Sequence, residues 1–311
     1  MVKSLAIIVP VFNEVDNLDS LVERVSISLK RNLDFDLILV DDGSTDRSWE
    51  KMRSLSNRFK NVTSVRLSRN FGHQYAVLAG LEYVQQSDYD AIVLIDADLQ
   101  DPPELIVEMT KLLSDDVDVV FGQRIDRQGE SFLKKITATF FYRLFNWLVP
   151  FEVPLDVGDF RVFKAKLVTV LVQSKDSSPF LRGLFAHAGF PSIAFQYSRE
   201  KRFAGQTKYN YRKMFSLALD AILCFSDKPF RLVLKYSFIA LILVFGISIY
   251  SLVNAVAYGA SPGWLSTFAL VSFFGTINVI LLALIGRYVT LGLSTTVNRP
   301  RWIVREVVKK P

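Results

Sequence analysis

Cysteine and histidine are scarce in this chain of 311 residues, and two common nucleotide-binding motifs are missing. Cys224 is the single cysteine, which excludes an intrachain disulfide and favours a reducing compartment. The two histidines, His73 and His187, are too few for a histidine-based metal site, so we expect core or polar-contact roles for them. No Gly-x-Gly-x-x-Gly fingerprint and no Gly-Lys-Ser/Thr phosphate loop occurs, which argues against dinucleotide cofactors and P-loop nucleotide hydrolysis.

Charge is absent over a long stretch near the C-terminus, where no Asp, Glu, Lys or Arg occurs from Tyr236 to Gly286. Because about 20 apolar residues cross a bilayer, this stretch predicts two transmembrane helices, at about 234–258 and 264–288. The turn between them has no charge and the flanks are basic, so the positive-inside rule places both flanks and the N-terminal domain in the cytoplasm. The flanking cations are Lys228, Arg231, Lys235, Arg299, Arg301, Arg305, Lys309 and Lys310.

The net charge of +6 does not indicate a nucleic-acid partner, because no predicted helix carries a basic stripe for phosphates. The first apolar run, residues 5–9, is too short for a signal peptide and is typical of a buried strand. We therefore expect an integral protein of the plasma or inner membrane with two spans and cytoplasmic termini. A homo-oligomer is compatible with the sequence.

Apolar runs alternate with segments of helical period through the first part of the chain. This alternation predicts a mostly parallel sheet with helices on both faces, an α/β fold whose ligands bind beyond the carboxyl ends of the strands. The expected strands are 5–9, 36–40, 62–67, 91–95 and 117–121, and the expected helices are 17–30, 48–59 and 74–85.

Two later segments, 131–149 and 211–225, mix basic and aromatic residues as interfacial membrane helices do. Ordinary core helices with solvated Lys and Arg are the alternative, but the adjacent apolar stretch favours the interfacial interpretation. The chain is thus expected to contain a cytoplasmic α/β domain at 1–210, an amphipathic linker at 211–230, two transmembrane helices within 231–291 and a basic cytoplasmic tail at 292–311.

The motif Asp96-Ala97-Asp98-Leu99-Gln100-Asp101-Pro102-Pro103 follows directly on the predicted strand 91–95. Two carboxylates at this position can present oxygen ligands to a divalent ion that bridges a diphosphate, and such ligands suit Mg²⁺ or Mn²⁺. The alternative is that Asp96 and Asp98 only cap the helix that follows the prolines. The position at the end of a strand favours the metal site.

Other polar residues are candidates for catalysis and phosphate binding. Asp156 and Asp159 could supply a general base or orient a nucleophile, although a structural pair of Asp159 with Arg161 is the alternative. Gly205 and Gln206 separate Arg202 from Lys208, which suggests a loop whose two cations meet a diphosphate. Further cations that could meet phosphates are Arg69, Arg124 and Arg127.

The motifs together resemble the polyprenyl-phosphate glycosyltransferases, inverting family-two enzymes with a GT-A fold. The group includes dolichyl-phosphate mannosyltransferases and bactoprenol glucosyltransferases, and the likeness covers nearly the whole chain, including a two-helix anchor. The motifs that carry it are Val9-Pro10-Val11-Phe12-Asn13-Glu14, Asp41-Asp42-Gly43-Ser44, the Asp96–Pro103 motif, Gly158-Asp159-Phe160-Arg161 and Arg202-Phe203-Ala204-Gly205-Gln206-Thr207-Lys208-Tyr209.

The resemblance implies a role for each matching position. Asp98 and Gln100, together with Asp96 beside the sugar nucleotide, would bind the metal. Arg202 and Lys208 would hold the diphosphate or the acceptor phosphate. The nucleotide sugar would contact Pro10, Phe12, Glu14, Val40, Asp42, Asp96, Ala97 and Arg124, and the catalytic candidates are Asp156, Asp159 and Arg161. Phe12 stands where the family often has Tyr, and Gln206 stands where Glu is common, so base contacts and the charge beside Lys208 differ.

The predicted activity is transfer of a hexose, best matched by glucose from UDP-glucose, to polyprenyl phosphate at the cytoplasmic face, with Mg²⁺ or Mn²⁺. GDP-mannose, UDP-galactose and an aminoarabinose donor would leave similar motifs. The alternatives are a processive polysaccharide synthase and a membrane-anchored scaffold that binds nucleotide sugar without turning it over. Such synthases usually carry more spans and a Gln-x-x-Arg-Trp motif, which Arg301-Trp302 only partly matches.

Overall fold

The computed structural model describes residues 2–29, 33–125, 143–152, 154, 157–174, 179–198, 222, 225–258, 263–296 and 300–310. These residues form two compact units. The first contains the α/β domain together with the C-terminal residues 299–311, and the second contains residues 147–150 and 222–298. Each unit is described by itself.

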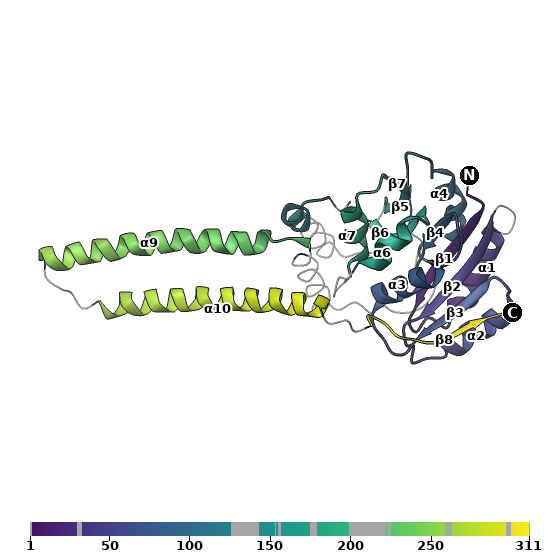
Figure 1. The fold of residues 1–311 in the computed structure, drawn as a ribbon, viewed down its shortest axis with the longest axis horizontal. Helices are drawn as coiled ribbons and strands as arrows, with labels where there is room; N and C mark the ends of the chain where they lie inside the picture. Colours follow the sequence, from purple (N-terminus) through teal and green to yellow (C-terminus); the bar gives the residue numbers. More distant parts are fainter. Residues whose placement is uncertain are drawn as a thin grey trace. The chain divides into compact units, whose positions relative to one another are not determined.

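The first unit is built on one sheet whose strands lie in the order β7-β5-β6-β4-β1-β2-β3-β8 (Figure 1). The central strands β4, β1, β2 and β3 are parallel neighbours, whereas β6 is antiparallel to both β4 and β5, and β8 is antiparallel to β3. The strands are β1 (Ser4–Val11), β2 (Asp34–Asp41), β3 (Val62–Leu67), β4 (Ala91–Leu94), β5 (Val119–Arg124), β6 (Val157–Lys164), β7 (Ser192–Tyr197) and β8 (Val304–Lys309).

Helices cover both faces of this sheet, because its strands are apolar on both sides. In β1, Leu5, Ile7 and Val9 join one buried cluster, whereas Ala6 and Ile8 join the other. Helices α1 (Leu18–Leu29), α2 (Ser48–Arg58) and α4 (Ile106–Lys111), with the short 3₁₀ helix η1 (Pro103–Leu105), pack on the first face. Helices α3 (His73–Val84), α6 (Leu167–Gln173) and α7 (Leu181–Ala188) pack on the second.

The expected α/β fold with a mostly parallel sheet is therefore confirmed. The predicted strands 5–9, 36–40, 62–67 and 91–95 correspond to β1–β4, and the three predicted helices correspond to α1–α3. The strand expected at 117–121 lies slightly later, as β5.

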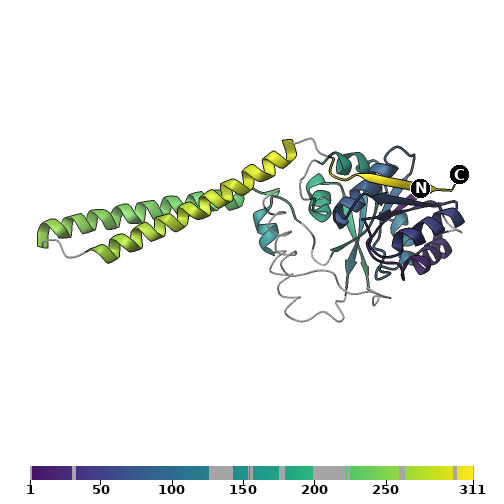
Figure 2. The same cartoon turned by 90° about the horizontal axis from the view of Figure 1, so that it is seen from below.

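The C-terminal segment completes the sheet. Val304–Lys309 forms β8, which pairs with β3 in a register that places Val65 opposite Val307. The backbone N–H of Ser68 donates a hydrogen bond of 2.9 Å to the carbonyl oxygen of Ile303 and extends this pairing. Part of the expected basic tail at 292–311, Val304–Lys309, thus forms an edge strand of the α/β sheet (Figure 2).

The second unit consists mainly of two long helices that run antiparallel, α9 (Lys228–Tyr258) and α10 (Trp264–Thr296) (Figures 1 and 2). Large apolar side chains are exposed on both, and Phe245 of α9 and Val279 of α10 are 69% and 67% exposed. At one end the rings of Phe230 and Tyr288 meet with their centroids 6.1 Å apart. Exposed apolar surface of this extent is unusual in water-soluble proteins.

Residues 273–290 of α10 form an apolar stretch of 18 residues with a mean hydropathy of 1.6 and none of it buried. Within the described residues, α10 is the one helix whose length and composition suffice to cross a membrane. The predicted pair of spans, at about 234–258 and 264–288, therefore stays a prediction. Most of the two predicted interfacial segments, 131–149 and 211–225, lies outside the described residues.

Candidate active site

Polar loops meet beyond the carboxyl ends of β1, β2 and β4, which are parallel neighbours in the sheet. Asn13 follows β1 and holds the loop after β2, because its Oδ1 atom accepts a hydrogen bond of 2.8 Å from the backbone N–H of Thr45. The backbone N–H of Asn13 in turn donates to Ser44 Oγ at 3.0 Å. The edge at which ligands bind in such sheets is therefore a connected set of loops.

Four predicted nucleotide-pocket residues lie at the ends of β1 and β2. Pro10 and Val40 are opposite each other in the β1–β2 register and are both buried. Phe12 and Glu14 follow β1, are half-buried and retain accessible surface toward the solvent. The Glu14 carboxylate accepts a 2.7 Å hydrogen bond from the side-chain amide of Asn17, which fixes its direction.

Asp42 is buried and binds the loop that leads into α3. Its two carboxylate oxygens accept hydrogen bonds from the backbone N–H groups of Phe71 at 2.7 Å and Gly72 at 2.9 Å. Burial raises the pKa of Asp42, and these two N–H groups oppose the rise. The neighbouring Gly43 has φ +68°, and a Cβ there would lie 2.4 Å from the backbone carbon of Arg69, so only glycine fits. Asp42 therefore helps to position the start of α3.

The acidic loop after β4 contains a strained residue. Leu99 has φ +58°, a left-handed conformation that is uncommon for a residue with a side chain. The Asp98 carboxylate accepts a hydrogen bond of 3.1 Å from the backbone N–H of Gln100, which closes a tight turn around Leu99. Strain of this kind is frequently stored at functional sites. Asp98 and Asp101 are both buried, at 5% and 0% exposure.

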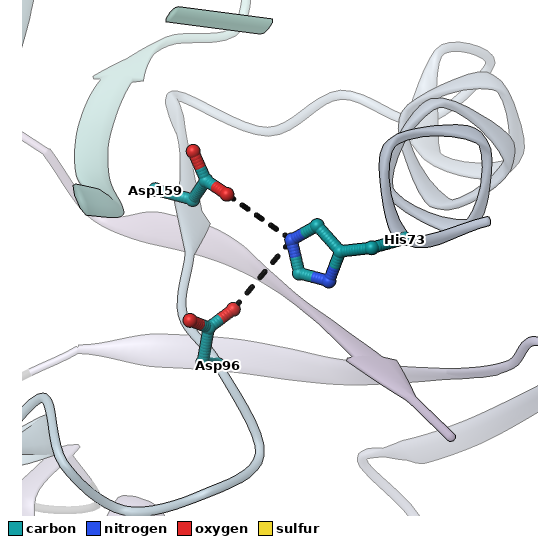
Figure 3. A group of neighbouring side chains, drawn as sticks. All are labelled: His73, Asp96 and Asp159. Atoms are coloured by element: carbon teal, nitrogen blue, oxygen red, sulfur yellow. Dashed lines mark hydrogen bonds and ion pairs between the residues drawn. The ribbon is translucent and has the colours of Figure 1, made fainter. Parts of the chain in front are cut away.

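His73 lies between two aspartates that come from different strands (Figure 3). Its Nε2 atom is 3.1 Å from Oδ2 of Asp159 in β6 and 3.7 Å from Oδ1 of Asp96 after β4. About a third of the His73 side chain and a quarter of the Asp96 side chain are exposed, whereas Asp159 is buried. The first residue of α3 thus bridges the predicted metal loop and the predicted catalytic strand.

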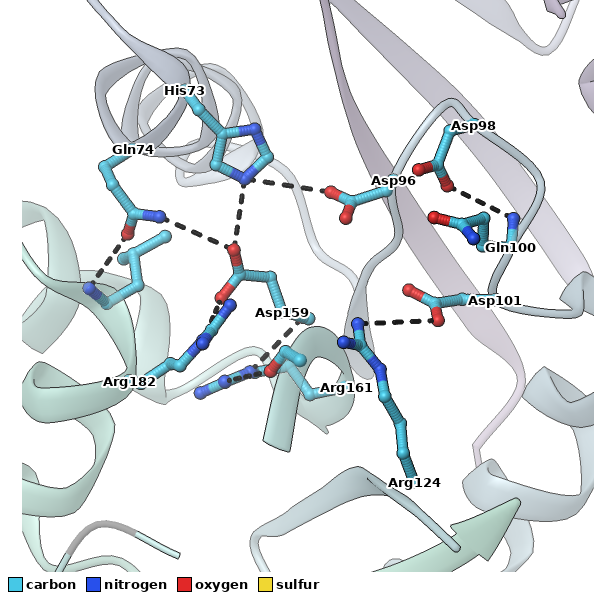
Figure 4. A network of polar contacts seen from close by, with 12 residues as sticks. His73, Gln74, Asp96, Asp98, Gln100, Asp101, Arg124, Asp159, Arg161 and Arg182 are labelled. Atoms are coloured by element: carbon cyan, nitrogen blue, oxygen red, sulfur yellow. Dashed lines mark hydrogen bonds and ion pairs between the residues drawn. The ribbon is translucent and has the colours of Figure 1, made fainter. Parts of the chain in front are cut away.

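Asp159 joins three elements (Figure 4). Its Oδ1 atom accepts a hydrogen bond of 3.0 Å from Arg182 Nε in α7, and its Oδ2 atom faces His73. Gln74 Nε2 lies 3.5 Å from the same oxygen, and Gln74 Oε1 accepts 2.9 Å from the backbone N–H of Leu181 at the start of α7. The carboxylate therefore holds the N-termini of α3 and α7 against β6.

The electrostatics of this cluster favour a charged histidine. Burial lowers the pKa of His73, but the hydrogen bond to Asp159 and the charges of Asp96 and Asp159 outweigh it and raise the pKa to about 9. Burial would raise the pKa of Asp159, yet Arg182 and His73 hold it well below its usual range. Burial raises the pKa of Asp96 to about 6; His73 opposes this rise, and the carboxylates of Asp159, Asp101 and Asp98 add to it.

Arg124 reaches the same edge from β5. Its Nη2 atom lies 3.9 Å from Asp101 Oδ1, and that carboxylate oxygen also accepts a 2.5 Å hydrogen bond from the Tyr197 hydroxyl. The Arg124 guanidinium packs over the backbone of Gly158, where an added Cβ would lie 2.6 Å from Nη2. Asp101 and Tyr197 thus orient Arg124, and its guanidinium has room because Gly158 has no side chain.

Arg161 is buried in the structure, at 3% exposure. Its Nη2 and Nε atoms donate to the backbone carbonyl oxygens of Gly158 and Asp159, at 3.0 and 3.3 Å. Its guanidinium also stacks on the Phe185 ring, 4.2 Å from the centroid. These contacts stabilise the strand that carries Asp159.

Two sets of side chains could hold a divalent cation. Ligand atoms of His73, Asp96 and Asp159 lie within 4.8 Å of one another. The two carboxylates raise the pKa of His73 to about 9, so an ion bound by the imidazole would have to displace a proton at neutral pH. Asp96, Asp98 and Gln100 lie on the same short loop after β4 and would offer only oxygen ligands, the kind that suits Mg²⁺ or Mn²⁺. This second set fits the ion better, because the carboxylates crowded around Asp96 would be neutralised by it.

The structure places most of the predicted site residues together and adds several to them. Ala97 is buried within the acidic loop at 4% exposure. The predicted residues Asp156, Arg202 and Lys208 lie outside the described residues, as do Arg127, Gly205 and Gln206. Sequence reasoning missed the contributions of His73, Gln74, Tyr197 and Arg182 to the site. A polar-contact role for His73 was expected, but nothing in the sequence indicated that Asp159 would be its partner.

Comparison with known proteins gives a consistent result. Residues 6–171 match the family described as Glycosyl transferase family 2. The chain is 38% identical to "Uncharacterized glycosyltransferase YkcC" of Bacillus subtilis (strain 168), over 97% of this chain and 93% of that protein. It is 29% identical to "Prophage bactoprenol glucosyl transferase homolog" of Escherichia coli (strain K12), over 98% and 99%, and 27% identical to "Bactoprenol glucosyl transferase" of Shigella phage SfX, over 97% and 98%.

Among solved structures, glucosyl-3-phosphoglycerate synthase from Mycobacterium tuberculosis is similar to this chain, with a TM-score of 0.50 and 18% identity. The similarity covers 71% of this chain and 78% of the synthase, whose structure was solved in a complex with Mn²⁺, UDP-glucose and phosphoglyceric acid. At this level of identity the likeness concerns the fold alone, and it agrees with the GT-A type of α/β fold expected for the first unit.

Proposed function

Because the chain belongs to glycosyl transferase family 2, we propose that it transfers a hexose from a nucleotide sugar to a polyprenyl phosphate at a membrane surface. The observation that carries this proposal is the cluster of His73, Asp96 and Asp159 at the carboxyl edge of the sheet, with Asp98 near enough to raise the pKa of Asp96. A long apolar helix in the same chain supports a lipid acceptor.

Glucose is the sugar that the names of two relatives indicate, and we assign UDP-glucose as its donor. One bactoprenol glucosyl transferase and one protein named as its homologue align with at least 97% of the chain. Their likeness therefore extends over the long apolar helices as well as the α/β domain. The acceptor class follows from the same relatives, since bactoprenol is the lipid in their names. We assign the donor to the loops after β1, β2 and β4, where Phe12 and Glu14 remain accessible.

The reaction brings two anions together, and the site must reduce their repulsion. An oxygen of the acceptor phosphate would attack the anomeric carbon of the sugar while the bond from that carbon to the diphosphate breaks, and the diphosphate leaves with the electron pair. A single displacement of this kind inverts the anomeric configuration. Because phosphate monoesters have a second pKa near 6, much of the nucleophile is already ionised at neutral pH. A strong general base is therefore not required.

Asp96, Asp98 and Gln100 would hold Mg²⁺ or Mn²⁺, which, when bound, stabilises the charge of the departing diphosphate. Arg124 faces the acidic loop and can contact the same phosphates. Arg202 and Lys208 are assigned to the diphosphate or the acceptor phosphate. Asp159 and Asp156 orient the acceptor in this proposal, and Arg161 supports Asp159 from within β6 through its backbone contacts.

We assign the α/β domain and both termini to the cytoplasm and the chain to the plasma or inner membrane, with α9 and α10 as two spans. The basic flanks Arg231 and Lys235 support this orientation. Labelling of an Ala260→Cys variant in a Cys224→Ser background by a membrane-impermeant maleimide would test it. Modification from the outside of intact cells supports two spans, whereas modification only after lysis contradicts them.

The activity itself is tested with the full chain in lipid nanodiscs, radiolabelled UDP-glucose, undecaprenyl phosphate and Mn²⁺. We expect an organic-extractable glucolipid that mild acid releases as glucose. UDP-galactose and GDP-mannose serve as competing donors, and turnover of one of them instead would correct the sugar. Binding of donor without lipid product would favour the scaffold, and a growing polymer would favour the processive synthase.

Asp98→Ala should reduce the rate by at least about 100-fold, since it removes an interaction that stabilises the transition state. Asp115→Ala is the matched control, because Asp115 is an exposed aspartate outside the site. Near-normal turnover by Asp98→Ala would contradict the metal assignment.

A further inference from the structure

Trp302 lies six residues after the end of α10 and is buried against α3 in the first unit. Its indole Nε1–H donates a 2.8 Å hydrogen bond to the Glu82 carboxylate, and its ring lies 6.4 Å from the Tyr75 ring. Tyr75 and Glu82 are seven residues apart in α3 and therefore share one face of that helix. A single side chain thus spans nearly two turns of α3.

The segment that carries Trp302 is itself firmly held. The Arg301 guanidinium donates to the backbone carbonyl oxygens of Val172, at 2.6 Å, and Ser174, after α6, and its carbon lies 4.6 Å from the Trp302 ring centroid. On the other side of Trp302, the carbonyl oxygen of Ile303 accepts from Ser68 N at 2.9 Å and leads into β8. Trp302 is therefore fixed from both sides along the chain.

Helix α3 is confined between this segment and the sheet. Gly80 packs so closely on β1 that an added Cβ would lie 2.5 Å from Ile8 Cγ2 and 3.1 Å from Val40 Cγ2. The helix cannot move toward the sheet without a clash, and Trp302 covers the face that carries Tyr75 and Glu82. The residues at the N-terminus of the same helix, His73 and Gln74, are those that reach Asp159.

We propose that Trp302 is a positioning residue, which fixes α3 and thereby holds His73 and Gln74 against Asp159 in the carboxylate cluster. Trp302 contacts Tyr75 and Glu82, and it acts on the cluster through them and through the rigidity of a helix of 12 residues. Its effect on catalysis rests on the proposed function, but its effect on α3 does not. The role gives the segment after α10 a function in the site that a solvated basic tail would lack.

A purely structural role is the competing explanation, in which Trp302 only adds to the stability of β8. The structural role and the positioning role predict different values of kcat for the folded enzyme. Loss of stability reduces the folded fraction and leaves the kcat of folded molecules unchanged. Loss of position lowers kcat in molecules that are fully folded and loosens the first turn of α3.

The experiment uses the full chain in nanodiscs and compares Trp302→Ala, Trp302→Phe and Glu82→Gln with Ile303→Ala. Ile303 is the neighbouring apolar residue, its side chain is 52% exposed, and it serves as the matched control. Glucolipid formation gives kcat and the donor KM, and hydrogen exchange measures protection of the first turn of α3. Thermal midpoints report the stability of each variant.

We expect Trp302→Ala to lower kcat by about tenfold with a donor KM within about threefold of wild type, because small misplacements of site residues are costly. Exchange in the first turn of α3 should accelerate in the same variant. Trp302→Phe keeps an aromatic ring and Glu82→Gln keeps an acceptor oxygen. Both variants should lose roughly threefold in kcat and stay folded. Ile303→Ala should match wild type in both measurements.

A double-mutant cycle with Gln74→Ala tests the route of the effect. If Trp302 acts through the N-terminus of α3, the combined loss in kcat will be smaller than the product of the two single losses. The proposal is overturned if Trp302→Ala and Trp302→Phe leave α3 exchange and kcat at the level of Ile303→Ala, or if the two losses simply multiply. If the wild type forms no lipid-linked sugar, the proposed function fails, and hydrogen exchange alone decides the role of Trp302.

Discussion

The Nε2 atom of His73, the first residue of α3, lies 3.1 Å from Oδ2 of Asp159 in β6. The same atom lies 3.7 Å from Oδ1 of Asp96, so one imidazole faces two carboxylates. This contact connects the helix that Trp302 covers, the acidic loop after β4 and the strand that carries the predicted catalytic aspartate. It also provides a cation within the acidic cluster, and the first two predictions follow from it.

Stability should depend on pH through His73. Its folded pKa of about 9 exceeds the ordinary value of 6.5, so the folded state binds the proton more tightly than the unfolded state. The stabilisation is fully present below pH 6.5 and is lost as the pH rises through 9. In EDTA, the thermal midpoint of wild type should fall relative to that of His73→Gln between pH 6.5 and 9.

His187→Gln is the control for this measurement, because His187 is the other histidine and contacts the Phe151 ring outside the cluster. It should reproduce the pH profile of wild type. A His73→Gln profile that runs parallel to wild type over this range would show that the folded pKa of His73 is near its ordinary value.

The two candidate metal-ligand sets predict different variants to fail in Mn²⁺ binding. If Asp96, Asp98 and Gln100 hold the ion, Asp98→Asn should weaken Mn²⁺ binding by more than about tenfold, while His73→Gln should retain it. The free Mn²⁺ signal in electron paramagnetic resonance measures this directly at neutral pH and without substrate. Equal weakening by His73→Gln would instead favour the set of His73, Asp96 and Asp159.

Removal of metal should abolish turnover in the wild type. EDTA is expected to stop glucolipid formation, and excess Mn²⁺ or Mg²⁺ should restore it, because a bound ion would stabilise the leaving diphosphate. Zn²⁺ should restore less, since the predicted ligands are all oxygen atoms. Full activity in EDTA after extensive dialysis would exclude a metal requirement.

Gly158→Ala should displace Arg124 while leaving the fold intact. The new Cβ would lie 2.6 Å from Arg124 Nη2, which is the far end of a flexible side chain, so the guanidinium moves and the backbone does not need to. We expect roughly a tenfold loss in kcat/KM for the donor, a loss expected for removal of one charge-assisted contact to phosphate. Gly275→Ala is the control, because an added Cβ there has no atom within 4 Å.

If Gly158→Ala lowers only the thermal midpoint and leaves kcat/KM for the donor unchanged, this role of Arg124 is contradicted. Arg124→Lys should lose activity to a similar extent if the guanidinium contacts the donor phosphates, since lysine cannot reproduce a bidentate contact.

Tyr197→Phe should destabilise the α/β domain. The variant removes the hydroxyl that donates to the buried Asp101 carboxylate at 2.5 Å, and an under-satisfied buried acceptor costs about 1–3 kcal/mol. Chemical denaturation measures this loss, and donor KM should rise as well because Asp101 orients Arg124. Tyr250→Phe, at a tyrosine that is 70% exposed, should leave both unchanged. An unchanged unfolding midpoint in Tyr197→Phe would show that the hydrogen bond is dispensable.

The parts of the fold that could be predicted from sequence are those with an apolar pattern ended by polar residues. Strands β1, β2 and β4 are short apolar runs that stop at Asn13, Asp41 and Asp96, and these signals placed both the sheet and its acidic edge. Strand β6 could not be found in this way. It contains Asp159 and Arg161, which a local pattern assigns to the surface, yet both are buried because their partners come from α3, α7 and the β6 backbone.

The contacts of His73 and the pairing of β8 also join residues that are distant in the sequence. The partners of His73 lie 23 and 86 residues away in the sequence, and no local signal connects them. Strand β8 contains two basic residues and one acidic residue among its six, which is typical of an exposed tail, and its pairing with β3 depends on the edge that β3 leaves open. Long-range contacts therefore decide the features that the sequence left open.

Strand β8 also bears on how a water-soluble form of the enzyme could be made. Stopping the chain ahead of α9 would discard Arg301, Trp302 and an entire edge strand, and would leave β3 with an unpaired border prone to aggregation. Excision of 225–299 and splicing of the two ends through a flexible glycine-serine bridge would instead keep every strand. The apolar helices are best regarded as an insert within the catalytic domain's own sequence.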